Sequence, residues 1–173
     1  KMVCDIKAQL NKEGTKRPEV VLDIGCGSGN LTEFIYEKLH PRRLVGMDLD
    51  GSMTKYASEN KPRSWPIEYY AASIAEPFDV LSKKLNLEEG SVDLIVSTHV
   101  FHWLWEDDRK KAWQNLYRLL KPEGRFYICV FGRSETLSAV YECGLTDKWR
   151  DYLVQKLHAD PKTGKLFGLD VSS

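Results

Sequence analysis

The sequence predicts an α/β protein built on a doubly wound parallel β-sheet. Short continuous apolar runs, which suit strands buried on both faces, recur along the chain. Segments with apolar residues at helical spacing separate these runs, and a glycine-rich turn joins the first run to the first helix. Strands that alternate with helices pair in parallel through right-handed crossovers, so we expect one sheet with helices on both faces.

A change in the spacing of the apolar residues marks where the first strand ends and the first helix begins. Residues 20–24 ("VVLDI") form an apolar run with two β-branched valines. Three glycines follow at alternate positions and free the backbone to turn tightly. The helix expected over 30–39 carries apolar residues on one face, at Leu31, Phe34, Ile35 and Leu39. Doubly wound sheets bind their ligands at such a strand-to-helix turn.

The remaining elements follow in order along the chain. Further strands are expected near residues 43–48, 67–72, 92–97 and 125–131. Further helices are expected near 51–60, 77–86, 108–120 and 134–157, the last one broken near Gly144.

Composition narrows the class of protein. The 173 residues suit one domain, and 25 Lys+Arg balance 25 Asp+Glu, so no electrostatic argument favours a nucleic-acid partner. No 18-residue apolar run predicts a membrane span, and no signal peptide opens the chain. The four cysteines form no C-x-x-C pair and have no zinc spacing, so we expect no metal site and a cytoplasmic protein. The oligomeric state stays open.

The first candidate site is the turn "GCGSG" with the acid before it. Its G-x-G-x-G spacing differs from the G-x-G-x-x-G of dinucleotide-binding proteins, and Asp23 lies where an anion would be repelled. An acid beside bare backbone suits a ligand with a cationic end. The candidate ligand-binding residues here are Asp23, Gly25, Cys26, Gly27 and Gly29.

A second acid follows the second predicted strand. Asp48 lies 19 positions after Gly29, a placement that suits hydrogen bonds to two ribose hydroxyls. Leu49 and Met53 could offer an apolar wall to a purine ring, whereas Asp50 is expected to cap the next helix.

These two units carry a resemblance. "VLDIGCGSGN" followed by "LVGMDLDGSM" resembles the first two motifs of the class I S-adenosylmethionine (SAM) dependent methyltransferases. The resemblance implies a Rossmann-like sheet of strand order 3-2-1-4-5, with SAM as cofactor. It also implies that the glycine turn faces the methionine part of SAM, that Asp48 holds the ribose, and that Ile74 and Ser97 belong to the cofactor site.

Two departures from the family pattern matter. Ser73 stands where the family usually has an acid that contacts the adenine amino group, so weaker adenine recognition is expected. The fold's final β-hairpin is not evident either, and the chain begins with Lys1. We therefore divide it into an incomplete helical lead-in (1–17), a SAM-binding core (18–133) and a truncated C-terminal helical segment (134–173).

Later residues narrow the resemblance to methyltransferases that act on carboxylic acids. "VDLIVSTHVFHWL" (92–104) has an apolar residue followed by His-Trp, as in the juvenile hormone acid methyltransferases of arthropods, and "NLYRLLKPEG" is similar to their following helix. Trans-aconitate and malonyl-carrier-protein methyltransferases share the motif more loosely. The implied substrate is a small apolar acid of the farnesoic or juvenile hormone acid type. An acid of pKa about 4 is ionised at pH 7 and needs no general base, only donors to position it. The rings of Trp103 and His102 offer N–H donors.

Three alternatives remain at this stage. An amine, protein or RNA acceptor would keep the SAM motifs and change the loop after the fourth strand, where the Asn/Asp-Pro-Pro-Tyr of many N-methyltransferases is absent. A SAM-fold binding module or pseudoenzyme without turnover is favoured by Ser73 and the truncation. A nucleotide-dependent dehydrogenase is disfavoured by the glycine spacing.

Overall fold

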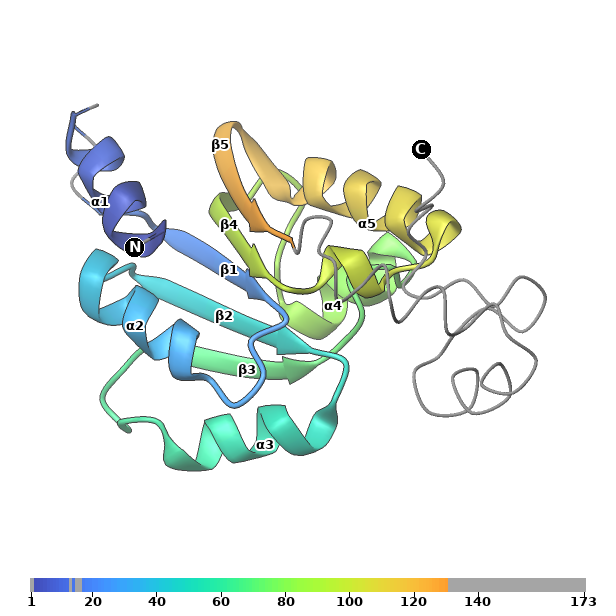
Figure 1. The fold of residues 1–173 in the computed structure, drawn as a ribbon, viewed down its shortest axis with the longest axis horizontal. Coiled ribbons are helices and arrows are strands. Elements are labelled where there is room, and N and C mark those ends of the chain that lie inside the picture. Colours follow the sequence, from blue (N-terminus) through green and yellow to red (C-terminus); the bar gives the residue numbers. More distant parts are fainter. Residues whose placement is uncertain (1, 13, 15–16, 131–173) are drawn as a thin grey trace, which may run out of the picture.

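A computed structural model describes residues 2–12, 14 and 17–130. Its five strands are β1 (Val20–Ile24), β2 (Arg43–Asp48), β3 (Ile67–Ala71), β4 (Val92–Thr98) and β5 (Leu120–Cys129). They form one parallel sheet in the order β3-β2-β1-β4-β5, and the arrows in Figure 1 point the same way. The predicted α/β class and strand order are therefore confirmed.

In the described part of the chain one helix precedes the first strand, and four helices and one short 3₁₀ turn connect the strands. They are α1 (Met2–Lys12), α2 (Asn30–Leu39), α3 (Gly51–Asn60), α4 (Phe78–Leu85), η1 (Phe101–Trp103) and α5 (Glu106–Leu119). None of these described helices has the length and apolar character needed to cross a membrane. The predicted helix over 134–157 lies outside the described residues.

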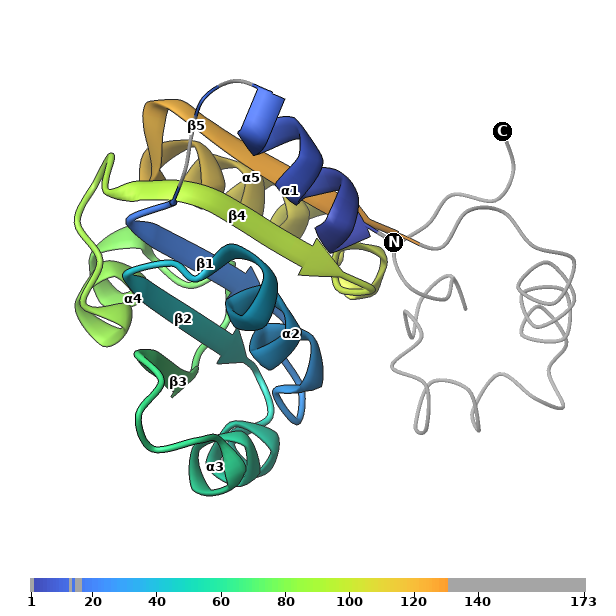
Figure 2. The ribbon, with the colours of Figure 1, turned by 90° about the vertical axis from the view of Figure 1, so that its left-hand side faces the viewer.

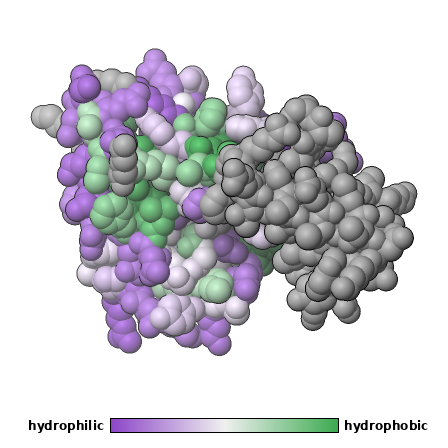
Figure 3. Space-filling view, in the orientation of Figure 1, coloured by the Kyte–Doolittle hydropathy of each residue, from purple (hydrophilic) through white to green (hydrophobic). Residues whose placement is uncertain are grey.

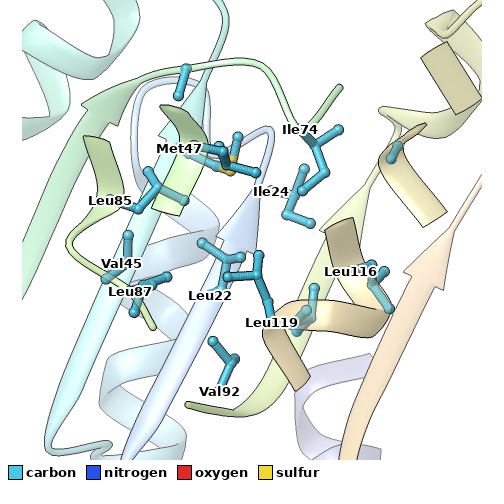
Figure 4. Close-up of a cluster of buried hydrophobic side chains, with 14 of the residues drawn as sticks. Leu22, Ile24, Val45, Met47, Ile74, Leu85, Leu87, Val92, Leu116 and Leu119 are labelled. Atoms are coloured by element: carbon cyan, nitrogen blue, oxygen red, sulfur yellow. The ribbon is translucent and has the colours of Figure 1, made fainter. Parts of the chain in front are cut away.

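The two faces of the sheet each bury a separate apolar cluster. On one face α1 and α2 pack on the strands, through Ile6 and Ile35 among others. On the opposite face α4 and α5 pack on Leu22 and Val45, together with Leu85 and Leu119 (Figures 2 and 4). Successive residues of β1 point to opposite faces, so Val21 and Leu22 enter different clusters. In Figure 3, hydrophilic residues dominate the margin of the molecule and apolar residues gather nearer its centre.

The fifth strand differs from the prediction. It begins at Leu120 rather than 125, directly after α5. Val92 of β4 pairs with Leu120, but Leu94 pairs with Arg125, so the "KPEG" residues form an irregularity within the strand and not a turn before it. The other strands and helices predicted within residues 17–130 agree with the structure to within two residues.

Candidate active site

A cavity of ≈ 360 Å³ opens at the carboxyl ends of the central strands. β1 and β4 are neighbours there, with Ile24 beside Ser97, and the winding of the sheet reverses between them. Open α/β sheets bind ligands at this switch point. The residues that line the cavity are Ile24, Gly25, Met47, Asp48, Leu49, Ala72, Ser73, Ile74, Thr98, His99, Val100, Trp103 and Leu104.

The glycine turn is fixed by packing from beneath. Gly25 has φ +77°, and a Cβ at this position would lie 2.0 Å from Cγ2 of Val100. Gly29 has φ +91°, and a Cβ there would lie 2.6 Å from the Tyr69 hydroxyl. Gly27 also has a positive φ of +52°, but among the described residues no atom beyond its two chain neighbours lies within 4 Å of its Cβ position. The middle of the turn therefore offers bare backbone that a ligand can approach.

Asp48 is held in place by two backbone donors. Its Oδ2 accepts a hydrogen bond from Gly27 N (2.9 Å), and its Oδ1 accepts one from Asp50 N (2.9 Å). Each oxygen keeps a further lone pair for a ligand hydroxyl. Asp50 caps α3, as predicted, by accepting from Ser52 N at 2.8 Å. Leu49 lines the cavity, whereas Met53 is not among its lining residues.

Asp23 lies behind the turn and is fully buried. Its Oδ2 accepts a hydrogen bond from the Thr32 hydroxyl (2.6 Å), and its Oδ1 has no hydrogen-bond partner within the described part of the chain. Burial raises the pKa of Asp23 to about 6, against the hydrogen bond from Thr32, which lowers it, and Asp48 adds a small repulsion. A cationic ligand at the turn would favour the charged form.

Cys26 is buried in the same turn, beside Gly27. Burial, reinforced by Asp23 and Asp48, raises the pKa of its thiol, so Cys26 stays protonated and unreactive.

Two serines predicted for the cofactor site have different settings. Ser73 lines the cavity; its Oγ accepts from Ala75 N (3.2 Å), so the hydroxyl proton and one lone pair remain for a ligand. Ile74 lines the cavity beside it. Ser97 is buried and donates its hydroxyl to the Ile24 carbonyl (3.0 Å), a bond that joins β1 to β4.

The two predicted acceptor-binding residues also differ in placement. Trp103 is 50% exposed and lines the cavity, whereas His102 is 4% exposed and is not among the lining residues. The two rings pack at a centroid distance of 5.3 Å. Burial lowers the pKa of His102, with a smaller contribution from His99. The imidazole of His102 is therefore held in its neutral form against Trp103.

The sequence reasoning did not assign His99 and Val100 to the site. His99 is exposed, lines the cavity and donates its backbone N–H to the Cys129 carbonyl of β5 (2.8 Å). The only available signal was its position just after the fourth strand. Within residues 2–12, 14 and 17–130, no three His, Cys, Asp or Glu side chains are grouped so that they could hold a metal ion.

Known proteins resemble the chain over this region. The family described as a methyltransferase domain matches residues 22–128. Juvenile hormone acid O-methyltransferase of Drosophila melanogaster is 30% identical over 96% of this chain and 57% of its own length. Malonyl-[acyl-carrier protein] O-methyltransferase of Geobacter sulfurreducens is 31% identical over 81% of this chain and 49% of its own.

A solved structure shares the fold. The N-methyltransferase NodS of Bradyrhizobium japonicum, in complex with S-adenosyl-L-homocysteine (SAH), superimposes with a TM-score of 0.55 at 22% identity, over 72% of this chain and 59% of that one. The chain spans about half the length of the curated relatives it matches.

Proposed function

The chain belongs to the methyltransferase-domain family, and from that membership we propose that it transfers the methyl group of SAM to the carboxylate of a small apolar acid. The observation that carries this proposal is the mixed lining of the cavity. Asp48 and Gly25 of the glycine turn form a polar part, which we assign to the cofactor and call the cofactor wall. Trp103 and Leu104 form a mostly apolar part, which we assign to the acceptor and call the acceptor wall. The cytoplasm is the proposed setting, in keeping with the free thiols of Cys4, Cys26 and Cys129.

The cofactor wall fits SAM. Asp48 has lone pairs available for the ribose hydroxyls, the space at the Cβ position of Gly27 is open, and Asp23 supplies a carboxyl group behind the turn. Leu49 and Ser73 line the end of the cavity assigned to the adenine ring. When bound, SAM supplies a methyl group made electrophilic by a positively charged sulfur. The cavity volume of ≈ 360 Å³ lies within the range of small-molecule sites.

The acceptor wall suits an ionised acid. The Trp103 indole N–H can donate to a carboxylate oxygen, and the Leu104 side chain can exclude water around it. A carboxylate attacks without losing a proton, so the site has to orient the acceptor but needs no base. The two curated relatives described above bear the names of O-methyltransferases, which supports an oxygen acceptor.

The test is a transfer assay with labelled SAM on the full-length protein, using farnesoic acid, lauric acid, dodecylamine and a phenol as acceptors. We expect label in the two acids, and a Trp103→Phe variant should lower acid methylation about tenfold or more while its affinity for SAH stays unchanged. Transfer to the amine alone would refute the carboxylate acceptor. Failure to bind SAH in calorimetry would refute methyltransferase activity altogether.

A further inference from the structure

We propose that His99 binds the acceptor carboxylate, so that its imidazole and the Trp103 indole together hold the group that receives the methyl. This inference rests on the proposed function and adds a residue to it. Three independent features of His99 support it: its place in the cavity, its backbone conformation, and its charge relative to the other lining residues.

The first feature is position. β1 and β4 end side by side, so the residues after Ile24 and after Ser97 meet at the same edge of the sheet. The contact is direct, because Val100 fills the space beneath Gly25. His99, the residue before Val100, is exposed and lines the cavity. The His99 side chain therefore lies next to the turn that the cofactor is proposed to occupy.

The second feature is backbone conformation. His99 has φ +61°, in the left-handed region that residues with a Cβ disfavour. The described residues include two other non-glycine examples, His40 (φ 48°) and Asn86 (φ 49°), and both end helices, where this conformation is common. His99 ends no helix. Glycine would satisfy the backbone there with less strain, so the presence of histidine indicates a use for its side chain.

The third feature is charge. Among the described residues that line the cavity, His99 is the one with a basic side chain and Asp48 is the one with an acidic side chain. Asp48 belongs to the cofactor wall. An acceptor carboxylate is thus favoured on the side of His99 and Trp103, whose rings both carry N–H groups of the kind that bind carboxylates.

The decisive variant is His99→Gly, which removes the imidazole and relieves the backbone. The matched control is His40→Gly, which makes the same change at an exposed helix end away from the cavity. His99→Asn is the conservative variant, because asparagine tolerates the left-handed conformation and keeps an N–H donor. For each full-length variant we would measure the melting temperature, the SAH affinity, and the affinity of the SAH complex for farnesoic acid by calorimetry.

We expect His99→Gly to melt no lower than the parent and to bind SAH within about twofold of it. Its affinity for farnesoic acid should fall about tenfold or more, as for the loss of a hydrogen bond to a charged group. His99→Asn should recover part of this loss, and His40→Gly should bind both ligands as the parent does.

Two results would overturn the role of His99 alone: unchanged farnesoic acid binding by His99→Gly, or an equal loss of SAH and farnesoic acid affinity, which would indicate a structural role. A different result would overturn the proposed function as well, namely a parent protein that binds SAH but not farnesoic acid and methylates only dodecylamine.

Discussion

Replacing Asp23 by asparagine should make the protein more favourable in stability, relative to the parent protein, at neutral pH than at pH 4. Asp23 titrates near its ordinary value of 3.8 when the chain is unfolded, but near 6 in the folded protein because it is buried. Between these values the folded state binds more protons than the unfolded state, so the free energy of unfolding falls as pH rises. The loss is complete above pH 6. At about 1.4 kcal/mol per pH unit it amounts to about 3 kcal/mol.

The asparagine side chain would stay neutral at every pH, and its carbonyl oxygen could still accept the hydrogen bond from Thr32. Its amide N–H₂ would take the place of the Asp23 Oδ1, which has no partner among the described residues, and this adds a pH-independent cost of about 1–3 kcal/mol. The informative quantity is therefore the change with pH in the stability gap between variant and parent. At pH 4 the unfolded carboxyl is already more than half ionised, so that gap should move by about 2.4 kcal/mol in favour of the variant between pH 4 and 7.

The assay is urea unfolding without cofactor at pH 4, 5, 6 and 7. Asp50→Asn is the matched control: asparagine also caps helices, and hydrogen bonds from Ser52 lower the pKa of the exposed Asp50. The stability that comes from this lowered pKa is already present above the ordinary value of 3.8 and is lost only below it, so the gap for Asp50→Asn should stay nearly constant from pH 4 to 7. A gap for Asp23→Asn that stays constant from pH 4 to 7 would show that Asp23 does not titrate in this range, and the reasoning would fail.

The other predictions concern the cofactor wall and use SAH affinity measured by calorimetry. Asp48→Ala should weaken SAH binding by about 1–3 kcal/mol, because the ribose hydroxyls lose their acceptor; unchanged affinity would show that the ribose lies elsewhere. Gly25→Ala should lower both stability and SAH affinity, because its methyl group would lie 2.0 Å from Val100 at φ +77°. Adding Val100→Ala should recover only the part of this loss that comes from the clash with Val100. Full recovery would contradict the argument that a residue with a Cβ is also strained at this positive φ. Ser73→Asp should tighten SAH binding by supplying a charged acceptor for the adenine amino group, whereas weaker binding would mean that the base does not contact residue 73.

Local sequence patterns predicted most of the fold. The runs that became β1 and β2 are apolar over the length of a buried strand, and the period of α2 begins directly after the glycines. The Asp50 cap was also predictable, because capping involves residues two or three positions apart. Asp48 could be placed at the cavity because the carboxyl ends of parallel strands share one edge.

The arrangement of the acceptor side was decided by contacts between distant residues. Nothing near position 99 in the sequence predicts a left-handed histidine, and the packing of Val100 beneath Gly25 joins residues 75 positions apart. In the folded protein His99 and Trp103 line the cavity, whereas His102, which the resemblance assigned to the acceptor, is buried.

The electrostatics of the glycine turn also depend on contacts between residues that are distant in the sequence. The amino-acid sequence alone predicts that an acid precedes the glycines and that the strands and helices alternate. The burial of Asp23 beside Thr32 and the rise of its pKa to about 6 follow from the folded arrangement of the whole domain. The physical reason is that secondary structure follows the local period of apolar residues, whereas desolvation depends on what the rest of the chain places around a side chain.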